Sequence, residues 1–160
     1  SHLTGFRTAL TRTINAYASF GKDTDVKPWQ YESCVLGADD VEIKIWHCGI
    51  CGSDIHTLDS GWGPATYPCV VGHEIVGEVT LAGANVSELA VGDRVGVGAQ
   101  VSACLNKNKR EGEKECRQCA TGQDAYCPHM VWTYNDLYKE DGAITYGGYA
   151  DYVRVPAMPG

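Results

Sequence analysis

The chain has 160 residues, which is enough for one domain with a hydrophobic core and hardly enough for two. Its 20 acidic and 13 basic side chains give a net charge of -7, which disfavours binding to nucleic acid or to anionic lipid. No apolar run reaches the roughly 18 to 20 residues that cross a bilayer, and the N-terminus lacks the apolar region of a signal peptide. We therefore expect a cytoplasmic protein with no nucleic-acid partner and no membrane partner.

Alternation of apolar and polar residues predicts short strands along the chain. The runs VEIKIW, IVGEVTLAG, GDRVGVG and YADYVRVP show this period, and glycines in or beside them indicate turns and bulges. These runs occupy residues 41–46, 75–83, 92–98 and 149–156. Helical turns are expected only at residues 53–59 and 119–126. The sequence therefore predicts a mainly β domain, either a barrel or a curled sheet.

Four of the eight cysteines form a group whose spacing suits a zinc ion. This four-cysteine group consists of Cys104, Cys116, Cys119 and Cys127. Four thiolates can enclose zinc completely and leave no open position, which is typical of a structural site. The alternative, a set of unconnected core cysteines, fits poorly because the sequence between them is polar. We therefore predict a structural zinc site.

A charged insertion at residues 105–115 separates the first two cysteines of this group. The sequence LNKNKREGEKE has no aromatic residue, and we interpret it as a solvated loop, with an interaction patch as the alternative. Lengthening the loop costs about 1.5 kcal/mol of closure free energy. Structural zinc contributes on the order of 10 to 16 kcal/mol in small peptides. The zinc site is therefore expected to tolerate the insertion.

The segment WHCGICGSDIH, at residues 46–56, allows three interpretations. Cys48 and Cys51 could form a redox dithiol, although such centres lie in alternating β/α sequences and this chain predicts short strands instead. They could also pair with the cysteines of residues 116–119 in a split zinc ribbon, but the separation is far longer than usual. The third interpretation is a catalytic metal site, for which His73 in YPCVVGHEIVGEV supplies a further ligand.

Together, these segments resemble the zinc-dependent medium-chain alcohol dehydrogenases. The pattern G-H-E-x2-G-x5-G-x2-V is complete from Gly72 to Val86, and HCGICGSDIH, VGDRVGVG, the four-cysteine group and GGYADYVRVP occur in the family's order. The forms CGICGSD and WG-x4-P-x-VVGHE look most like the cinnamyl alcohol dehydrogenase branch. The resemblance implies a GroES-like, partly open β-barrel with a zinc-binding lobe at residues 16–160. Residues 1–15 would be an N-terminal extension or a first strand.

The resemblance also implies a role for each candidate site residue. Cys51 and His73 would bind a catalytic zinc ion, and Glu74 would be a carboxylate that can approach or leave the metal. A thiolate and a neutral imidazole fix zinc and leave it Lewis-acidic. Ser53 would hydrogen-bond the substrate oxygen, and His56 would continue the proton path to solvent.

Asp54 would orient His73 from behind the metal, although an aspartate at this place is also typical of a helix cap. The four-cysteine group would hold the structural zinc. Trp62 is expected either to line the substrate pocket or to pack against its neighbours. The remaining cysteines are interpreted as small apolar residues: Cys34, Cys48 and Cys69.

The sequence does not supply the family's cofactor domain. No G-x-G-x-x-G motif follows a strand, so we expect the Rossmann domain and a further catalytic cysteine to be absent, and the isolated chain to be inactive. The branch resemblance implies NADP(H) as the cofactor of the complete enzyme, a small alcohol or aldehyde as substrate, and a homodimer as its assembly. The alternative is a non-enzymatic zinc-binding or assembly module on the same scaffold.

Overall fold

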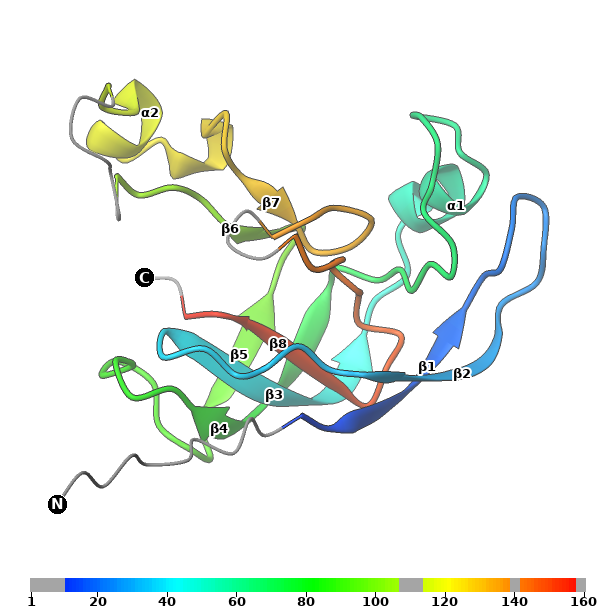
Figure 1. The fold of residues 1–160 in the computed structure, drawn as a ribbon, viewed down its shortest axis with the longest axis horizontal. Coiled ribbons are helices and arrows are strands. Elements are labelled where there is room, and N and C mark those ends of the chain that lie inside the picture. Colours follow the sequence, from blue (N-terminus) through cyan, green and yellow to red (C-terminus); the bar gives the residue numbers. More distant parts are fainter. Residues whose placement is uncertain (1–10, 107–113, 139–141, 158–160) are drawn as a thin grey trace, which may run out of the picture.

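The computed structural model describes residues 11–106, 114–138 and 142–157, and its strands form three antiparallel sheets (Figure 1). The largest sheet has the strand order β5-β4-β3-β8, and two small sheets pair β1 with β2 and β6 with β7. The strand bounds are Thr13–Ala18 (β1), Lys27–Glu32 (β2), Asp40–Cys48 (β3), Ile75–Ala82 (β4), Arg94–Val97 (β5), Gln100–Ser102 (β6), Val131–Trp132 (β7) and Tyr152–Pro156 (β8). The short helices are α1 (Gly52–Leu58), α2 (Arg117–Ala120) and the 3-10 turn η1 (Asp124–Tyr126).

The main hydrophobic core lies against one face of the four-stranded sheet. Ile75 and Val79 alternate with more exposed residues along β4, as a strand with one buried face requires. Val41 and Ile43 of β3 pack into the same core, and each is only 2% exposed. Complete burial of one such side chain contributes roughly 1.5 to 3 kcal/mol. This core fixes the central strand β3, from whose end the candidate site begins.

The other face of β3 carries a buried ion pair. Arg154 of β8 donates two hydrogen bonds to Oε2 of Glu42, at 2.9 and 2.7 Å, and the Glu42 side chain is fully buried. A guanidinium nitrogen of Arg12 lies 3.1 Å from Oε1 of the same carboxylate. Because Glu42 is buried between the two core residues Val41 and Ile43, this part of the strand is covered on both faces.

The mainly β prediction is confirmed, and so are the four predicted strands, which correspond to β3, β4, β5 and β8. The expected helical turns are also confirmed as α1 and as the pair α2 and η1. The sequence did not predict β2, β6 or β7, and β1 runs across the boundary placed between residues 15 and 16. Most of the charged insertion, residues 107–113, lies outside the described residues.

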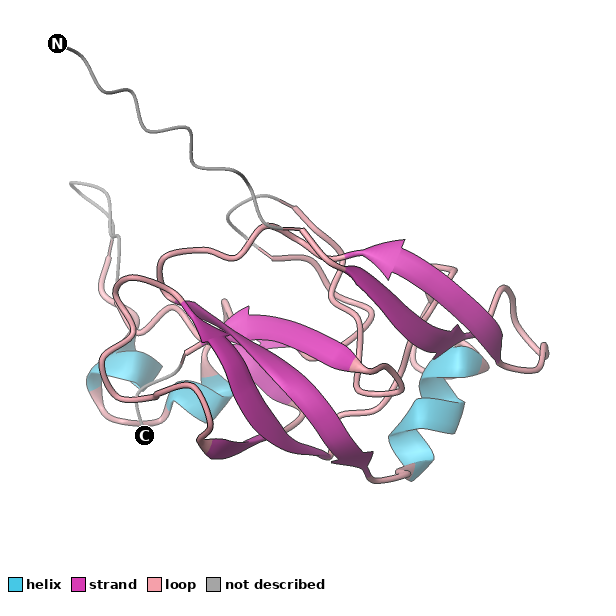
Figure 2. Cartoon of the chain, turned by 90° about the horizontal axis from the view of Figure 1, so that it is seen from below, coloured by secondary structure: helices cyan, strands magenta, loops and turns pink. Residues whose placement is uncertain are grey.

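The helices lie at opposite ends of the domain in both views, with α1 on one side and α2 on the other (Figures 1 and 2). The strands β6 and β7 lie between them in Figure 1. Among the described residues, no helix is long and apolar enough to span a membrane. The two ends correspond to two separate groups of potential metal ligands.

Candidate metal and substrate site

The first group forms where the ladder between β3 and β4 ends. Cys48 and Ile75 are the last paired residues, and the Gly49 N–H donates to the Glu74 carbonyl at 2.9 Å just beyond them. The segment after β3 and the segment before β4 are therefore held side by side. As a result, one ligand atom from each of Cys51, His73 and Glu74 lies within 4.8 Å of the others. We call these residues the three-donor group.

The carboxylate of Asp54 ties the two loops together. Its oxygens accept hydrogen bonds from the backbone N–H of Cys51 at 3.0 Å and from that of Gly72 at 3.2 Å. The hydroxyl of Tyr149 donates a third, at 2.8 Å. Asp54 is the third residue of α1 and is not the N-cap, which is Cys51. Its Oδ1 lies 3.9 Å from His73 Nδ1, beyond hydrogen-bond distance, so it supports the histidine mainly through the backbone of the preceding residue.

Tyr134 is the direct hydrogen-bond partner of His73. Its hydroxyl lies 3.2 Å from His73 Nδ1 and donates to Ser53 Oγ at 3.4 Å. The two rings also stack, with centroids 5.6 Å apart and planes 19° apart. Burial raises the pKa of Tyr134 to about 12; the hydrogen bond with Ser53 opposes this rise, and the nearby carboxylate of Asp54 adds to it. Sequence reasoning missed this residue because nothing in VWTYND distinguishes it from the other tyrosines.

His56 lies on the exposed side of α1. Its ring packs against Trp62, with centroids 5.2 Å apart. Trp62 itself is 71% exposed and lines a cavity together with Ser53 and His73. The hydroxyl of Ser53 accepts a hydrogen bond from Tyr134. Of the two residues of the predicted proton path, Ser53 therefore contacts Tyr134 at the cavity wall, whereas His56 contacts Trp62 on the exposed side of α1.

This cavity has a volume of about 490 Å³ and opens in front of Ser53 and His73. Its remaining lining is largely aromatic or small, and comprises Thr57, Trp62, Gly63, Pro64, Ala99, Trp132, Thr133, Tyr134 and Asn135. An apolar cavity with a few convergent polar groups is the usual form of a small-molecule site. The cavity is large enough for a small organic molecule, and the hydroxyl of Ser53 and the imidazole of His73 are at its wall.

The donors of the three-donor group fit a zinc ion chemically. Cysteine, histidine and glutamate together supply a thiolate, an imidazole nitrogen and a carboxylate oxygen, each of which is a normal zinc ligand. Three protein ligands with a further open position are typical of catalytic zinc, in contrast to a closed structural shell. Glu74 is exposed whereas Cys51 and His73 are partly buried, so the carboxylate is the donor that is most free to move.

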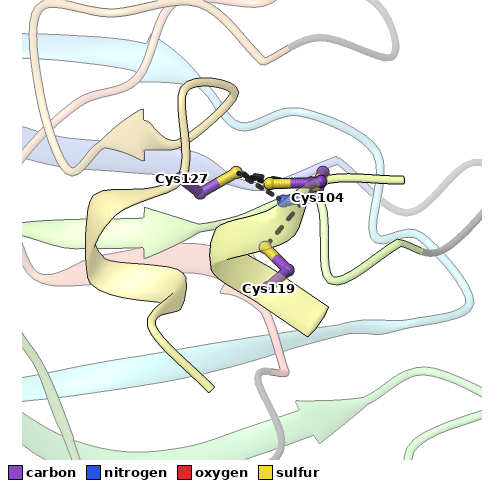
Figure 3. Close-up of side chains that lie close together, drawn as sticks. Cys104, Cys119 and Cys127 are labelled. Carbon is purple, nitrogen blue, oxygen red and sulfur yellow. Dashed lines mark hydrogen bonds between the residues drawn. The ribbon is translucent and has the colours of Figure 1, made fainter. Parts of the chain in front are cut away.

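The second group brings together all four cysteines that the sequence predicted, and one sulfur from each lies within 4.8 Å of the others. The Sγ of Cys104 is 3.5 Å from the Sγ of both Cys119 and Cys127 (Figure 3). The Sγ of Cys116 is 3.9 Å from the Sγ of Cys127. Figure 3 shows Cys119 on α2, with its sulfur directed toward the other two labelled sulfurs. Four converging sulfurs without a disulfide fit a tetrahedral zinc site.

The pKa values of these thiols differ because their surroundings differ. Burial, followed by the other cysteines, raises the pKa of Cys119 to about 12, and burial also raises that of Cys104. Burial acts in the same direction on Cys127, but backbone N–H groups of Cys104 and His129 donate to its sulfur and lower its pKa to about 7. A divalent cation would be needed to hold all four sulfurs as thiolates.

Cys48 belongs to neither group. Its Sγ donates weakly to the Gly49 carbonyl at 3.5 Å, and a Cβ added to Gly72 or Gly148 would lie 2.7 or 2.8 Å from this sulfur. Burial raises the pKa of the Cys48 thiol, and both cysteines of the C-x-x-C pair are free. Cys48 therefore packs as a small apolar residue against glycine backbones. This environment argues against a redox dithiol.

The fold and the two groups of potential ligands define a GroES-like β domain with two candidate metal sites. Residues 37–159 match the family model of the alcohol dehydrogenase GroES-like domain. The chain therefore belongs to the alcohol dehydrogenase GroES-like domain family, which confirms the resemblance that the motifs indicated.

Two relatives with similar sequences are plant proteins named as dehydrogenases. A "Probable mannitol dehydrogenase" of Medicago sativa is 44% identical over 144 residues, which cover 89% of this chain and 37% of that protein. A "Probable cinnamyl alcohol dehydrogenase 6" of Oryza sativa subsp. japonica is 39% identical over 140 residues, or 88% of this chain and 36% of the relative. The chain thus spans well under half the length of these relatives.

Solved structures of longer enzymes also match this chain over part of their length. The enzyme CAD of Helicobacter pylori, solved in complex with NADP(H), has a TM-score of 0.82 and 34% identity, over 92% of this chain and 40% of its own. The cinnamyl alcohol dehydrogenase SbCAD4 of Sorghum bicolor has a TM-score of 0.81 and 37% identity, over 91% of this chain and 39% of its own. The fold of the described residues is therefore that of one part of these longer enzymes.

Proposed function

We propose that this chain forms the zinc-binding catalytic domain of an NADP(H)-dependent alcohol dehydrogenase that interconverts primary alcohols and aldehydes. The observation that carries the proposal is the three-donor group, whose His73 lies at the wall of a 490 Å³ cavity beside Ser53. A thiolate, an imidazole and a carboxylate next to a largely apolar cavity suit a metal that acts on a small organic substrate.

In this proposal Cys51 and His73 hold the catalytic zinc ion, and Glu74 is the carboxylate that approaches it or leaves it. The four-cysteine group holds the structural zinc. A zinc ion at the three-donor group would act as a Lewis acid toward the substrate oxygen. Asp54 keeps the donors in place, because it binds the backbone on both sides of the group.

Ser53 and His56 handle the proton in this proposal. A hydroxyl can accept one hydrogen bond while it donates another, so Ser53 can bind the substrate oxygen and pass a proton. The exposed ring of His56, next to Trp62, can exchange that proton with solvent. The aromatic residues Trp62, Trp132 and Tyr134 around the cavity support a substrate with an apolar body.

NADP(H) as the hydride donor and acceptor is supported by the Helicobacter pylori structure, which was solved with that cofactor. The cofactor would bind to a Rossmann domain, and we assign none of these 160 residues to it. We also propose a homodimer in the cytoplasm for the complete enzyme, on the basis of family resemblance alone.

The proposal is tested by joining this chain to the part of the Helicobacter pylori enzyme that it does not cover. We expect the fused protein to oxidise NADPH in the presence of benzaldehyde, and expect Cys51→Ser to abolish this activity. Cys34→Ser is the matched control, because Cys34 belongs to neither group of donors. A folded, zinc-loaded fused protein that binds NADPH but has no turnover would favour a non-enzymatic module instead.

A further inference from the structure

We propose that Tyr134 is a positioning residue, whose hydroxyl links His73 to Ser53 and thereby selects the nitrogen of His73 that binds metal. The inference rests on the proposed function, because it assigns His73 to a metal. Tyr134 thereby takes the position next to His73 that the family resemblance implied for Asp54. Three features support this role: the direction of the hydrogen bonds at the Tyr134 hydroxyl, the position of Ser53 at the cavity, and the firm anchoring of the tyrosine.

The number of protons on the tyrosine hydroxyl fixes the direction of its hydrogen bonds. Tyr134 has one hydroxyl proton, and the geometry directs it to Ser53 Oγ at 3.4 Å. Its contact with His73 Nδ1, at 3.2 Å, must then be a hydrogen bond from Nδ1–H to the phenolic oxygen. With the proton on Nδ1, Nε2 keeps its lone pair and is the nitrogen available to a metal. The partner of one ring nitrogen commonly decides the role of the other in this way.

Ser53 links the hydrogen bonds of Tyr134 and His73 to the cavity in which a substrate would bind. Since Ser53 Oγ accepts the proton of Tyr134, its own proton is free to point elsewhere. Ser53 lines the cavity, so that proton is available to an oxygen atom of a bound substrate. Tyr134 thus sets the direction of hydrogen bonding along His73, Tyr134 and Ser53, and prepares Ser53 as a donor. Without the tyrosine hydroxyl, Ser53 could rotate and donate to other acceptors.

Tyr134 is held firmly enough to orient both neighbours. Its side chain is only 8% exposed and packs with the buried residues Cys69 and Val71. The backbone on either side is fixed, because Thr133 N–H donates to the Ala99 carbonyl at 3.0 Å and Asn135 N–H donates to the Thr145 carbonyl at 3.2 Å. A residue anchored on both sides in this way loses little entropy when it orients its neighbours.

The test uses the 160-residue chain with its four-cysteine group filled by one equivalent of zinc, and Co²⁺ as the probe for the three-donor group. Tyr134→Phe keeps the ring and removes the hydroxyl, and we expect it to weaken Co²⁺ binding about tenfold, as removal of partners of metal-binding histidines does. Tyr138→Phe is the matched control and should leave the affinity unchanged, because the Tyr138 hydroxyl bonds to the distant Arg154 carbonyl.

A spectroscopic readout separates positioning from a merely structural role. In the zinc-loaded wild-type chain labelled with ¹⁵N-histidine, we expect His73 to carry its proton on Nδ1. Ser53→Ala should shift the His73 nitrogen signals, because it frees the Tyr134 proton, and should have no such effect when Tyr134 is already phenylalanine. This double-mutant comparison measures the coupling through the hydroxyl directly.

The possible outcomes separate this role from the proposed function. If Cys51→Ser leaves Co²⁺ binding intact, the three-donor group is not the metal site and the proposed function fails. If Cys51→Ser abolishes binding but Tyr134→Phe binds like wild type, the role of Tyr134 is overturned while the proposed function stands. If Tyr134→Phe does not fold, the wild-type measurement decides, since a proton on Nε2 of zinc-loaded His73 overturns the inference.

Discussion

The carboxylate of Asp54 and the hydroxyl of Tyr149 are joined by a 2.8 Å hydrogen bond across 95 positions of the chain. Asp54 lies in α1, and Tyr149 lies in the segment that leads to β8. The same carboxylate binds the backbone N–H groups of Cys51 and Gly72. Three distant segments therefore meet at one side chain, immediately behind the three-donor group.

Removal of the Tyr149 hydroxyl is expected to lower the free energy of unfolding. Tyr149→Phe deletes a hydrogen bond to a buried carboxylate, and a bond to a charged group contributes about 1.5 to 3 kcal/mol. Urea unfolding followed by circular dichroism measures the change. Tyr126→Phe, at a position that is 76% exposed, is the control and should change stability little. Equal stability of the two variants would show that Asp54 does not depend on Tyr149.

Glycine at position 49 is expected to be necessary for the position of Glu74. A Cβ on Gly49 would overlap Oε2 of Glu74 and lie 2.9 Å from its Cβ, so the glutamate would have to move. We expect Gly49→Ala to weaken Co²⁺ binding at the three-donor group by about tenfold, comparable to other changes next to metal ligands. Gly52→Ala is the matched control, because its Cβ would meet no atom within 4 Å. Unchanged binding in Gly49→Ala would mean that Glu74 is not a ligand.

The four-cysteine group is expected to bind zinc more tightly than the three-donor group, because it offers four protein ligands. Cys119→Ser should remove one zinc ion per chain in native mass spectrometry, whereas Cys34→Ser should remove none. Zinc uptake near pH 7.5 should release at least two protons per ion at this group, because the raised pKa values of Cys104 and Cys119 keep both thiols protonated until the metal binds. A pH indicator measures this release, and zinc binding without it would contradict the assignment.

The raised pKa of Tyr134 makes the fold sensitive to alkali. Tyrosine ionises near pH 10 in an unfolded chain, and in the folded chain the Tyr134 pKa is about 12. The stability that this difference provides is complete below about pH 10 and is lost as the pH rises toward 12. We therefore expect the urea midpoint of the wild type to fall in this range, and that of Tyr134→Phe to fall less steeply. Parallel curves for the two proteins would exclude a contribution from Tyr134.

The buried ion pair between Glu42 and Arg154 should be costly to break. Glu42→Gln removes the negative charge that pairs with the buried guanidinium group of Arg154 and with Arg12, and breaking a buried pair in this way costs about 3 to 5 kcal/mol. Urea unfolding measures the loss. Glu88→Gln, at an exposed position, removes the same charge from the protein and should cost little. A small loss for Glu42→Gln would indicate that other groups compensate for the charge of Arg154.

The sequence predicted the strands whose periodicity is regular and missed those defined by long-range pairing. β4 alternates buried and exposed residues clearly, and it was predicted within one residue. β6 and β7 have three and two residues, which is too short to show any period. β2 has no fully buried residue, so its sequence KPWQYE shows little alternation of apolar and polar positions.

The residues of the candidate site also fall into those that the sequence predicted and those that it missed. Cys51, His73 and the four-cysteine group could be found because metal ligands must be particular residue types, and their motifs are specific. The structure then brought each set of donors together, including Cys104 despite the insertion that follows it. Tyr134 and Tyr149 could not be found, because their roles depend on where the chain returns after 61 and 95 positions. No local sequence pattern indicates which distant residues will come into contact.

The four-cysteine group is connected to the cavity through β6 and β7. The four-cysteine group occupies the segment between these strands, and Thr133 and Tyr134, just after β7, line the cavity. Exchange of residues 100–132, including both strands, between related enzymes would thus also change the position of Thr133 and Tyr134 at the cavity wall. If β6 and β7 of the recipient are retained, exchange of only the residues between them should leave Thr133 and Tyr134 in place at the cavity wall.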